Sequence, residues 1–339
     1  MGAVRREVGL LASAPWAAGV RVGTIFLGGG TPSLLEASEL GAILEALRGG
    51  FALDAAAEVT VECNPESVSR EKLAGYRAAG VTRISLGVQS LDDAVLAAIG
   101  RLHTAAEARQ AFDITRAAGF TNVSVDLIYG LPGLDADTWR ATIEGVLGWG
   151  PEHFSAYGLT LDPGSIWAST GVAGLPPEDA VVGHYWTAVE CAAARGYEHY
   201  EVSNYARAGH RSRHNQVYWR RGEYLACGPG AAGFVGDVRY TNVKPVGRYA
   251  DVLDEGRLPF DTAERLDARQ ARAETLILAL RTADGVPSAL LAERGADDAP
   301  LRRRLAAWRD RGLLLDDGAR ARLSDAGFLL SDALFVELL

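Results

Sequence analysis

Five short apolar stretches, each typical of a strand, alternate with segments whose apolar side chains have helical spacing. The expected strands are 24–27, 58–62, 83–88, 123–128 and 153–159. The units repeat every 25–40 residues or so, which is typical of parallel strands joined by crossover helices. This alternation favours a parallel α/β sheet or barrel, in which ligands bind at the carboxyl ends of the strands.

The first expected strand ends in the sequence Gly28-Gly29-Gly30-Thr31-Pro32. Three glycines let the backbone turn sharply and approach a ligand closely, because no Cβ stands in the way. Pro32 suits the first turn of a helix, and the Leu and Ile spacing of 33–47 predicts that helix. A helix N-terminus after such a turn favours an anionic or polar ligand group. Taken alone, the stretch is equally consistent with a tight turn that binds nothing.

Polar or glycine positions recur at or near the end of each expected strand. They are the turn 28–31, Glu62, Gln89, Asp126 and Tyr157. Because parallel strands end at one edge of a sheet, we expect these residues to line one site. For single residues another role stays open: Asp126 could join a helix cap or an ion pair, and Glu62 could brace the turn that follows it.

A long helical segment is expected between Gln89 and Gly119, and it contains Arg101 and His103. Arg101 could be a solvated helix residue, and His103 is more typical of packing or capping than of ligand binding. Residues 161–182 are rich in Gly, Pro, Ser and Ala, which indicates an insertion or linker.

The region after this linker is aromatic and then changes character. A helix is expected over 184–195, a strand-like aromatic stretch over 197–206, and a second glycine-rich turn over 224–233. From about residue 264, helices are expected over 271–282, 300–311 and 324–339, with a hairpin around Asp317-Gly318. This order predicts a small winged-helix-like domain. Its arginines are more typical of a solvated helix face than of DNA binding: Arg302, Arg303, Arg304, Arg309 and Arg311.

Charge and composition exclude several classes of protein. The net charge of −9 argues against a general nucleic-acid binder. The sequence lacks an apolar run of about 18 residues, so no transmembrane helix is expected. Glu7 and Pro15 interrupt any signal-peptide core, and we therefore expect a cytoplasmic protein. The three cysteines lie far apart, which excludes a disulfide framework and a CxxC metal motif.

An ordered set of motifs resembles the radical S-adenosylmethionine (SAM) enzymes of the oxygen-independent coproporphyrinogen III oxidase group. The set consists of GGGTP at 28–32, ExNP at 62–65, GVQS at 87–90, an arginine twelve residues after Gln89, DLIYGLP at 126–132 and YxL at 157–159. HNQVYW at 214–219 resembles the HNxxYW signature of the heme chaperone branch, HemW. The resemblance extends from about residue 24 into the C-terminal domain.

The resemblance implies an α/β fold, a partial (β/α)6 barrel that lacks its first strand, followed by a small winged-helix-like α+β domain. It implies a barrel at 1–205, the HNxxYW region with a connecting segment at 206–262, and the C-terminal domain at 263–339. It also implies SAM at the carboxyl mouth of the barrel. The implied SAM-binding residues are Gly29, Gly30 and Thr31 beside the methionine part, Glu62 at the amino group or ribose, Arg101 at a carboxylate, Asp126 at the ribose hydroxyls, and Gln89 and Gly158 at further contacts.

The resemblance further implies a [4Fe-4S] cluster held by a CxxxCxxC motif ahead of the GGGTP strand. This sequence has no such motif, and Cys63, Cys191 and Cys227 do not have its spacing. Since reductive SAM cleavage needs the cluster, the chain as written is not expected to form the 5′-deoxyadenosyl radical. We expect a start codon assigned too far downstream rather than a relative without a cluster. An in-frame CxxxCxxC upstream of Met1 would agree with this expectation.

The function implied is that of a heme chaperone, which carries heme as cargo to acceptor proteins such as respiratory-chain components. His214, Asn215, Tyr218 and Trp219 are the heme-binding candidates, although His214 is equally consistent with a structural imidazole in an aromatic cluster. Ala232 stands where family members usually have histidine. Two alternatives stay open, an oxygen-independent coproporphyrinogen III oxidase and a SAM-binding module without chemistry. Whether the chain is an enzyme, and whether it contacts a membrane peripherally, also stays open.

Overall fold

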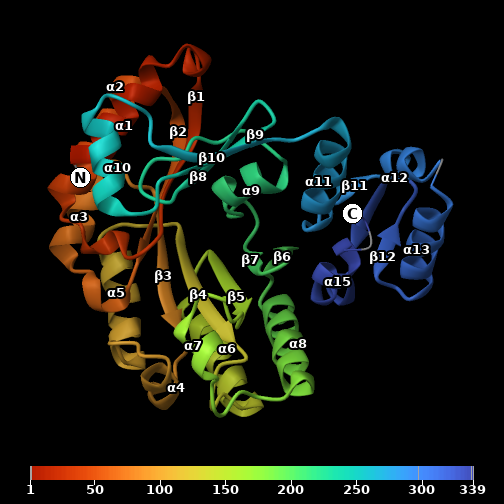
Figure 1. Cartoon of the computed structure of the whole chain (residues 1–339). Helices are drawn as coiled ribbons and strands as arrows, with labels where there is room; N and C mark the ends of the chain where they lie inside the picture. Colours follow the sequence, from red (N-terminus) through yellow and green to blue (C-terminus); the bar gives the residue numbers. More distant parts are fainter. Residues whose placement is uncertain (1, 297, 337, 339) are drawn as a thin grey trace.

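The computed structural model describes residues 2–296, 298–336 and 338. Its centre is a seven-stranded sheet in the order β1-β2-β3-β4-β5-β7-β6, which curls into a half-barrel (Figure 1). Five strands pair in parallel: β1 (Arg21–Leu27), β2 (Ala52–Cys63), β3 (Arg83–Gln89), β4 (Val123–Tyr129) and β5 (His153–Gly158). Two antiparallel strands complete it, β7 (Asn204–Ala206) and β6 (Glu198–Glu201). The predicted α/β barrel-type fold is confirmed.

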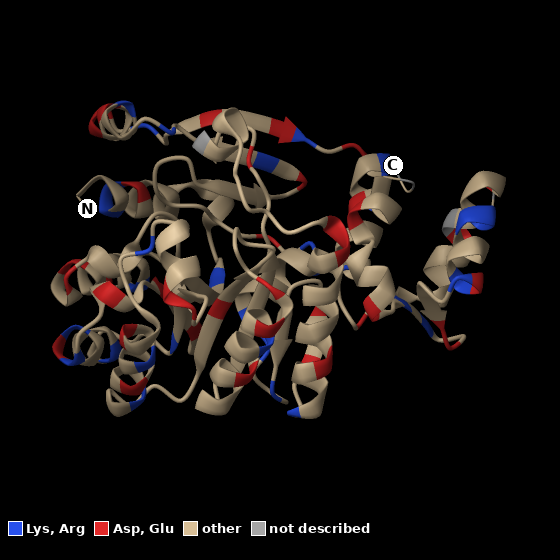
Figure 2. Cartoon of the chain, turned by 90° about the horizontal axis from the view of Figure 1, so that it is seen from below, with Lys and Arg blue, Asp and Glu red and all other residues tan. Residues whose placement is uncertain are grey.

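One helix precedes the first strand and the others follow parallel strands, most of them packed against one face of the sheet. They are α1 (Gly2–Ser13), α2 (Ala37–Gly50), α3 (Arg70–Ala78), α4 (Asp93–Ala98), α5 (Ala105–Ala117), α6 (Ala136–Trp149), α7 (Ile166–Thr170) and α8 (Glu178–Ala194). Strand residues such as Val61, Leu86 and Leu127 form one buried cluster with helix residues such as Leu44 and Trp139. Figure 2 shows acidic and basic residues interspersed over the outer helices.

The opposite, inner face of the same strands is polar. Its residues alternate with the apolar ones: Glu58, Thr60 and Glu62 on β2, Ser85 on β3, Ser124 and Asp126 on β4, and His153, Ser155 and Tyr157 on β5. Successive side chains of a strand point to opposite faces. Parallel strands that are apolar on both faces would instead give continuous apolar runs. The sequence therefore builds a half-barrel with an apolar outside and a polar interior.

Two predicted helices differ from the structure. The helix expected over 33–47 begins only at Ala37, because Pro32–Leu34 form a 3₁₀ turn and the Glu36 N–H is capped by Glu39 at 3.0 Å. The long helix expected between Gln89 and Gly119 is two helices, α4 and α5. Gly100 has a left-handed φ of 71°, and Thr104 caps the start of α5. Arg101 and His103 therefore lie in the connection between the helices.

The segment after the half-barrel contains a second sheet that the sequence did not predict. Helix α9 (Arg213–Trp219) comes first, followed by β8 (Ala232–Val235), β9 (Val238–Asn242), α10 (Val246–Asp254) and β10 (Phe260–Arg265). The three strands form an antiparallel sheet in the order β10-β9-β8. Every residue of β10 is exposed and half of them are charged, so the strand carries no apolar signal.

The C-terminal part has its own buried cluster, which includes Leu280, Trp308 and Phe328. Its elements are α11 (Ala268–Leu280), β11 (Val286–Pro287), α12 (Ser288–Gly295), α13 (Ala299–Asp310), β12 (Leu314–Asp316), β13 (Arg320–Leu323), α14 (Asp325–Leu329) and α15 (Ser331–Val336). The hairpin predicted at Asp317-Gly318 joins β12 and β13. The prediction of a single last helix over 324–339 is wrong, because α14 ends at Leu329 and α15 begins at Ser331.

Within the part of the chain that the structure describes, no helix is both long enough and apolar enough to cross a lipid bilayer.

Candidate functional site

The glycine turn after β1 is held against β2. Gly29 and Gly30 have left-handed φ values of 82° and 64°, and the Gly29 N–H donates to Glu62 Oε2 at 3.0 Å. A Cβ at Gly28 would lie 2.5 Å from the Phe26 ring and 2.9 Å from Glu62 Oε2. The turn therefore needs glycine both for its backbone angles and for space. Its three glycines are exposed, so their main-chain groups are accessible to a ligand.

Asp126 lies in the middle of β4, in register with Gly87 and Ser155. Its carboxylate accepts hydrogen bonds from Ser85 Oγ and Ser155 Oγ, both at 2.8 Å. Burial raises the pKa of this carboxyl, and the serine hydroxyls lower it. The side chain is only half-buried, so the acid faces an interior that solvent or a ligand can enter.

Glu62 and Asp126 influence each other across the inner face of the sheet. Burial raises the pKa of Glu62, the Gly29 N–H lowers it, and the charge of Asp126 raises it further. Two carboxylates that face one interior favour donors on the ligand, such as hydroxyl or ammonium groups.

Arg101 and Gln89 meet around Gly87. Arg101 Nη2 donates to the Gly87 carbonyl at 2.7 Å and to Asn64 Oδ1 at 3.0 Å. A Cβ at Gly87 would lie 2.9 Å from Gln89 Nε2 and 3.3 Å from Arg101 Nη2, so glycine leaves room for both. Burial lowers the pKa of Arg101, and its buried Nε has no partner among the described residues. Since buried donors are normally paired, this nitrogen suits an anionic ligand group.

Gly158 ends β5 and pairs with Tyr129 at the same edge of the sheet. A Cβ at Gly158 would lie 3.1 Å from the Tyr129 hydroxyl. Burial of the hydroxyl, followed by the charge of Asp126, raises the pKa of Tyr157, although 42% of the residue is exposed. The structure thus brings Gly29, Glu62 and Asp126 together, with Gln89 and Arg101 beside them. Gly158 lies at the end of β5, the strand next to that of Asp126.

Helix α9 packs inside the half-barrel against β1. The His214 ring bonds through Nδ1 to Thr24 Oγ1 at 2.9 Å and through Nε2 to the Tyr218 hydroxyl at 2.8 Å. It stacks on Phe26 with ring centroids 5.2 Å apart, and its main-chain N–H donates to Glu58 Oε1 at 3.0 Å. Burial lowers the pKa of His214 to about 4. Both ring nitrogens are therefore engaged, and the ring is neutral near pH 7.

The other two residues of the motif have different surroundings. The Asn215 N–H donates to Ser212 Oγ at 3.3 Å, which caps α9. Trp219 lines a cavity next to the C-terminal domain, and the Arg281 guanidinium lies 5.8 Å from its ring centroid. The four heme-binding candidates are thus divided, with His214 and Tyr218 toward β1 and Trp219 toward the C-terminal domain.

The described residues do not fit a [4Fe-4S] cluster. Throughout 2–296 and 298–336, no three His, Cys, Asp or Glu side chains gather closely enough to hold a metal ion. Cys63 and Cys191 are buried and Cys227 is half-buried. Burial raises the pKa of the Cys63 thiol to about 12, which disfavours the thiolate that a metal requires.

Several residues of this region were not identified from the sequence. Thr24, Phe26 and Glu58 hold α9, and Ser85 and Ser155 hold Asp126. The alternating polar residues of β2, β4 and β5 were the available signal, because a polar period of two marks one face of a strand.

Known proteins resemble this chain along most of its length. Residues 10–146 match the radical SAM superfamily model, and residues 266–330 match the HemN C-terminal domain model. The chain is 40% identical to the heme chaperone HemW of Mycobacterium tuberculosis (strain H37Rv), a match that covers 94% of this chain and 81% of that protein. It is 34% identical to the heme chaperone HemW of Bacillus subtilis, over 80% of this chain and 73% of that protein.

A solved structure agrees with the fold. The coproporphyrinogen III oxidase HemN of Escherichia coli, a radical SAM enzyme, superposes with a TM-score of 0.86 at 22% identity. The superposition covers 99% of this chain and 82% of the HemN chain.

Proposed function

Because the chain belongs to the heme chaperone HemW family of radical SAM proteins, we propose that it binds heme and transfers it to acceptor proteins. The observation that carries this proposal is the 40% identity to a HemW protein, which spans 94% of this chain. We further propose the cytoplasm as its compartment and respiratory-chain components among its acceptors. We divide it into a barrel at 1–205, an HNxxYW region at 206–262 and a C-terminal domain at 263–339.

We propose that the carboxyl edge of the sheet binds SAM. The exposed main chain of Gly29, Gly30 and Thr31 would border the methionine part, and Glu62 would accept from its amino group. The unpaired Arg101 Nε suits the carboxylate, and Asp126 would accept from the ribose hydroxyls. Gln89 and Gly158 would supply further contacts. Bound SAM supplies a sulfonium-linked adenosyl group, and these residues bind and orient it.

An Asp126→Asn variant is expected to bind SAM about tenfold more weakly, because an amide replaces a charged acceptor of similar shape. Isothermal titration calorimetry with SAM measures this loss. The matched control is Asp113→Asn, which removes an exposed carboxylate paired with Arg109 on α5. Equal SAM affinity of Asp126→Asn and the wild-type protein would contradict the assignment of Asp126.

Titration of the protein with hemin is expected to produce a saturable shift of the Soret absorption band. Saturation near one heme per chain supports the heme chaperone proposal, and the absence of any saturable shift would overturn it.

The same titration tests the HNxxYW helix. If His214 ligates heme iron, it must first release Thr24 or Tyr218, because both of its ring nitrogens are engaged. The His214→Ala variant is then expected to shift the Soret maximum of the heme complex, whereas His210→Ala, close by in the chain, leaves it unchanged. An identical spectrum for wild-type protein and His214→Ala would exclude His214 as a ligand.

A further inference from the structure

A cavity of about 240 Å³ lies between α9, the end of β6 and the C-terminal domain, remote in sequence from the glycine turn. Its lining includes Arg211, Arg220 and Arg320, the ring of Trp219, and a single carboxylate, Asp284. The arginines come from the segment before α9, from its C-terminal end and from β13.

The arginines of this cavity are incompletely neutralised. Glu198 and Asp284 hold Arg211, whose Nη1 lies 2.9 Å from Asp284 Oδ1. Arg220 lies 3.9 Å from the other Asp284 oxygen, and 69% of its side chain is exposed at the rim. With Glu198 counted, three guanidinium groups face two carboxylates, so one positive charge remains.

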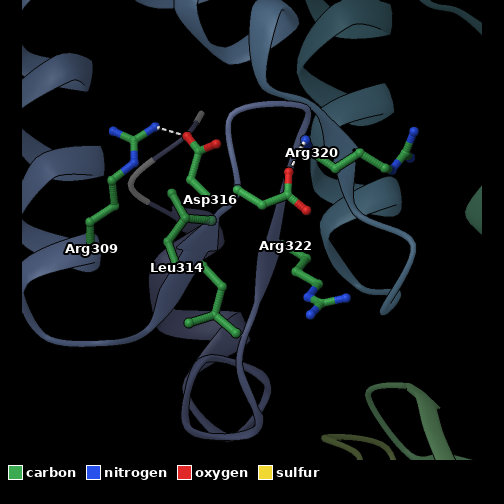
Figure 3. Close-up of a pocket in the computed structure, with 7 residues that line it drawn as sticks. Arg309, Leu314, Asp316, Arg320 and Arg322 are labelled. Atoms are coloured by element: carbon green, nitrogen blue, oxygen red, sulfur yellow. Dashed lines mark hydrogen bonds and ion pairs between the residues drawn. The ribbon is translucent and has the colours of Figure 1, made fainter.

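Arg320 contributes most clearly to this excess. Its Nε donates to the Asp284 main-chain carbonyl at 2.6 Å, and its Nη2 donates to the Gly285 carbonyl at 2.9 Å. Figure 3 shows a neighbouring pocket, which Arg320 also lines, and in it the Arg320 side chain points away from Asp316. The Asp316 carboxylate accepts instead from Arg309 Nη2 at 2.7 Å. Among the described residues, no carboxylate forms an ion pair with the Arg320 guanidinium.

An unpaired donor also belongs to this cavity. Trp219 Nε1 is inaccessible to solvent and has no hydrogen-bond partner among the described residues. Buried donors in native proteins are usually satisfied, and no described residue supplies an acceptor for this nitrogen. A carboxylate has only acceptors, and its two oxygens match the planar fork of a guanidinium.

The size of the cavity limits what it can hold. Pockets that enclose a whole small ligand measure roughly 300–1,000 Å³. This cavity is smaller, so it admits one arm of a ligand while the rest stays outside.

On the basis of the proposed heme-carrying function, we propose that this cavity binds one propionate carboxylate of heme. Arg220, Arg320 and Trp219 Nε1 are the donors. The cavity thereby assigns a binding role to the C-terminal domain, through β13.

The test compares hemin with hemin dimethyl ester, whose propionates carry no charge. Absorbance titration of the wild-type protein is expected to give at least about tenfold weaker binding of the ester. The double variant Arg220→Gln/Arg320→Gln is expected to bind hemin as weakly as the ester and to discriminate no longer between them. The control Arg303→Gln/Arg322→Gln removes the same amount of charge from the C-terminal domain, outside the cavity, and keeps the discrimination.

Two further variants keep the test decisive. Trp219→Phe retains an aromatic ring but loses the N–H, so it is expected to weaken hemin binding severalfold and ester binding hardly at all. Arg220→Gln alone, at an exposed side chain, replaces the double variant if that protein does not fold. Equal affinities of the wild-type protein for hemin and its ester would overturn the propionate site and leave heme binding intact. Absence of saturable binding of either compound would overturn both proposals.

Discussion

Replacing Glu201 with glutamine is expected to raise the free energy of unfolding by about 3 kcal/mol at pH 8 and to change it little at pH 4. Glu201 ends β6 and forms a bridge with Thr282 of the C-terminal part. The residue is 1% exposed, and neither carboxylate oxygen has a hydrogen-bond partner among the described residues. Burial raises its pKa to about 7, although the nearby Asn204 side chain, the Ser203 N–H and the charge of Arg281 lower that pKa.

The pH window of this effect follows from the two pKa values of Glu201. The carboxyl ionises near pH 4.5 in the unfolded chain and near pH 7 in the folded one. Between these two pH values the folded state therefore binds one proton more than the unfolded state. Wild-type stability therefore falls as the pH rises from 4.5 to 7, by about 1.4 kcal/mol per pH unit from this group, and levels off above that. Glutamine resembles the protonated acid at every pH.

Urea unfolding of wild-type protein and Glu201→Gln at several pH values between 4 and 8 measures the difference. The control is Glu190→Gln, which removes an exposed carboxylate on α8 and is expected to change stability by less than about 0.5 kcal/mol at any pH. A Glu201→Gln difference that does not vary with pH would contradict the burial of an unpaired carboxyl.

The second large effect, expected for His214→Gln, has the opposite dependence on pH. Burial lowers the pKa of His214 from 6.5 to about 4, so the unfolded state takes up the proton first on acidification. This group therefore stabilises the wild-type protein above pH 6.5, and that contribution is lost as the pH falls toward 4. With the partial exposure of the side chain taken into account, the wild-type protein loses about 2 kcal/mol of unfolding free energy over this pH range. The His214→Gln variant lacks the titrating imidazole and is not expected to lose this contribution.

The same unfolding series tests both variants, because their windows overlap between pH 4.5 and 6.5. In that range the two contributions oppose each other in the wild-type protein. Relative to wild type, Glu201→Gln is expected to gain stability with rising pH, while His214→Gln is expected to gain it with falling pH. Difference curves that slope in the same direction with pH would show that one of the two side chains is more accessible to solvent than the structure has it.

The parallel part of the fold could be predicted because its signals are local. Apolar strands, helical spacing and a turn such as Asp317-Gly318, where Gly318 has a φ of 87°, each act over a few residues. The antiparallel sheet of β8, β9 and β10 could not be predicted, because the exposed β10 is stabilised by main-chain pairing with β9 rather than by apolar side chains.

In the candidate site, too, the residues with local sequence signals could be predicted, and those defined by long-range contacts could not. Gly29 follows β1 and Glu62 lies at the end of β2, so a rule about strand ends finds them. The hydrogen bond between them joins neighbouring strands. Thr24 was missed because its partner, His214, lies 190 residues later in the sequence. The arginine cavity was missed for a similar reason, since α9 and β13 meet only in the folded chain.

Phe26 has a consequence for how the two proposed ligands affect each other. Its ring lies directly against the space that Gly28 leaves free and stacks on the imidazole of His214. A ligand that displaces this ring from one side alters the free energy of binding on the other. Thermodynamic linkage then requires symmetry: if SAM changes the affinity for heme by some factor, heme changes the affinity for SAM by that same factor. If both ligands displace the Phe26 ring, the occupancy of the glycine turn and the occupancy of the heme site are coupled by one and the same factor.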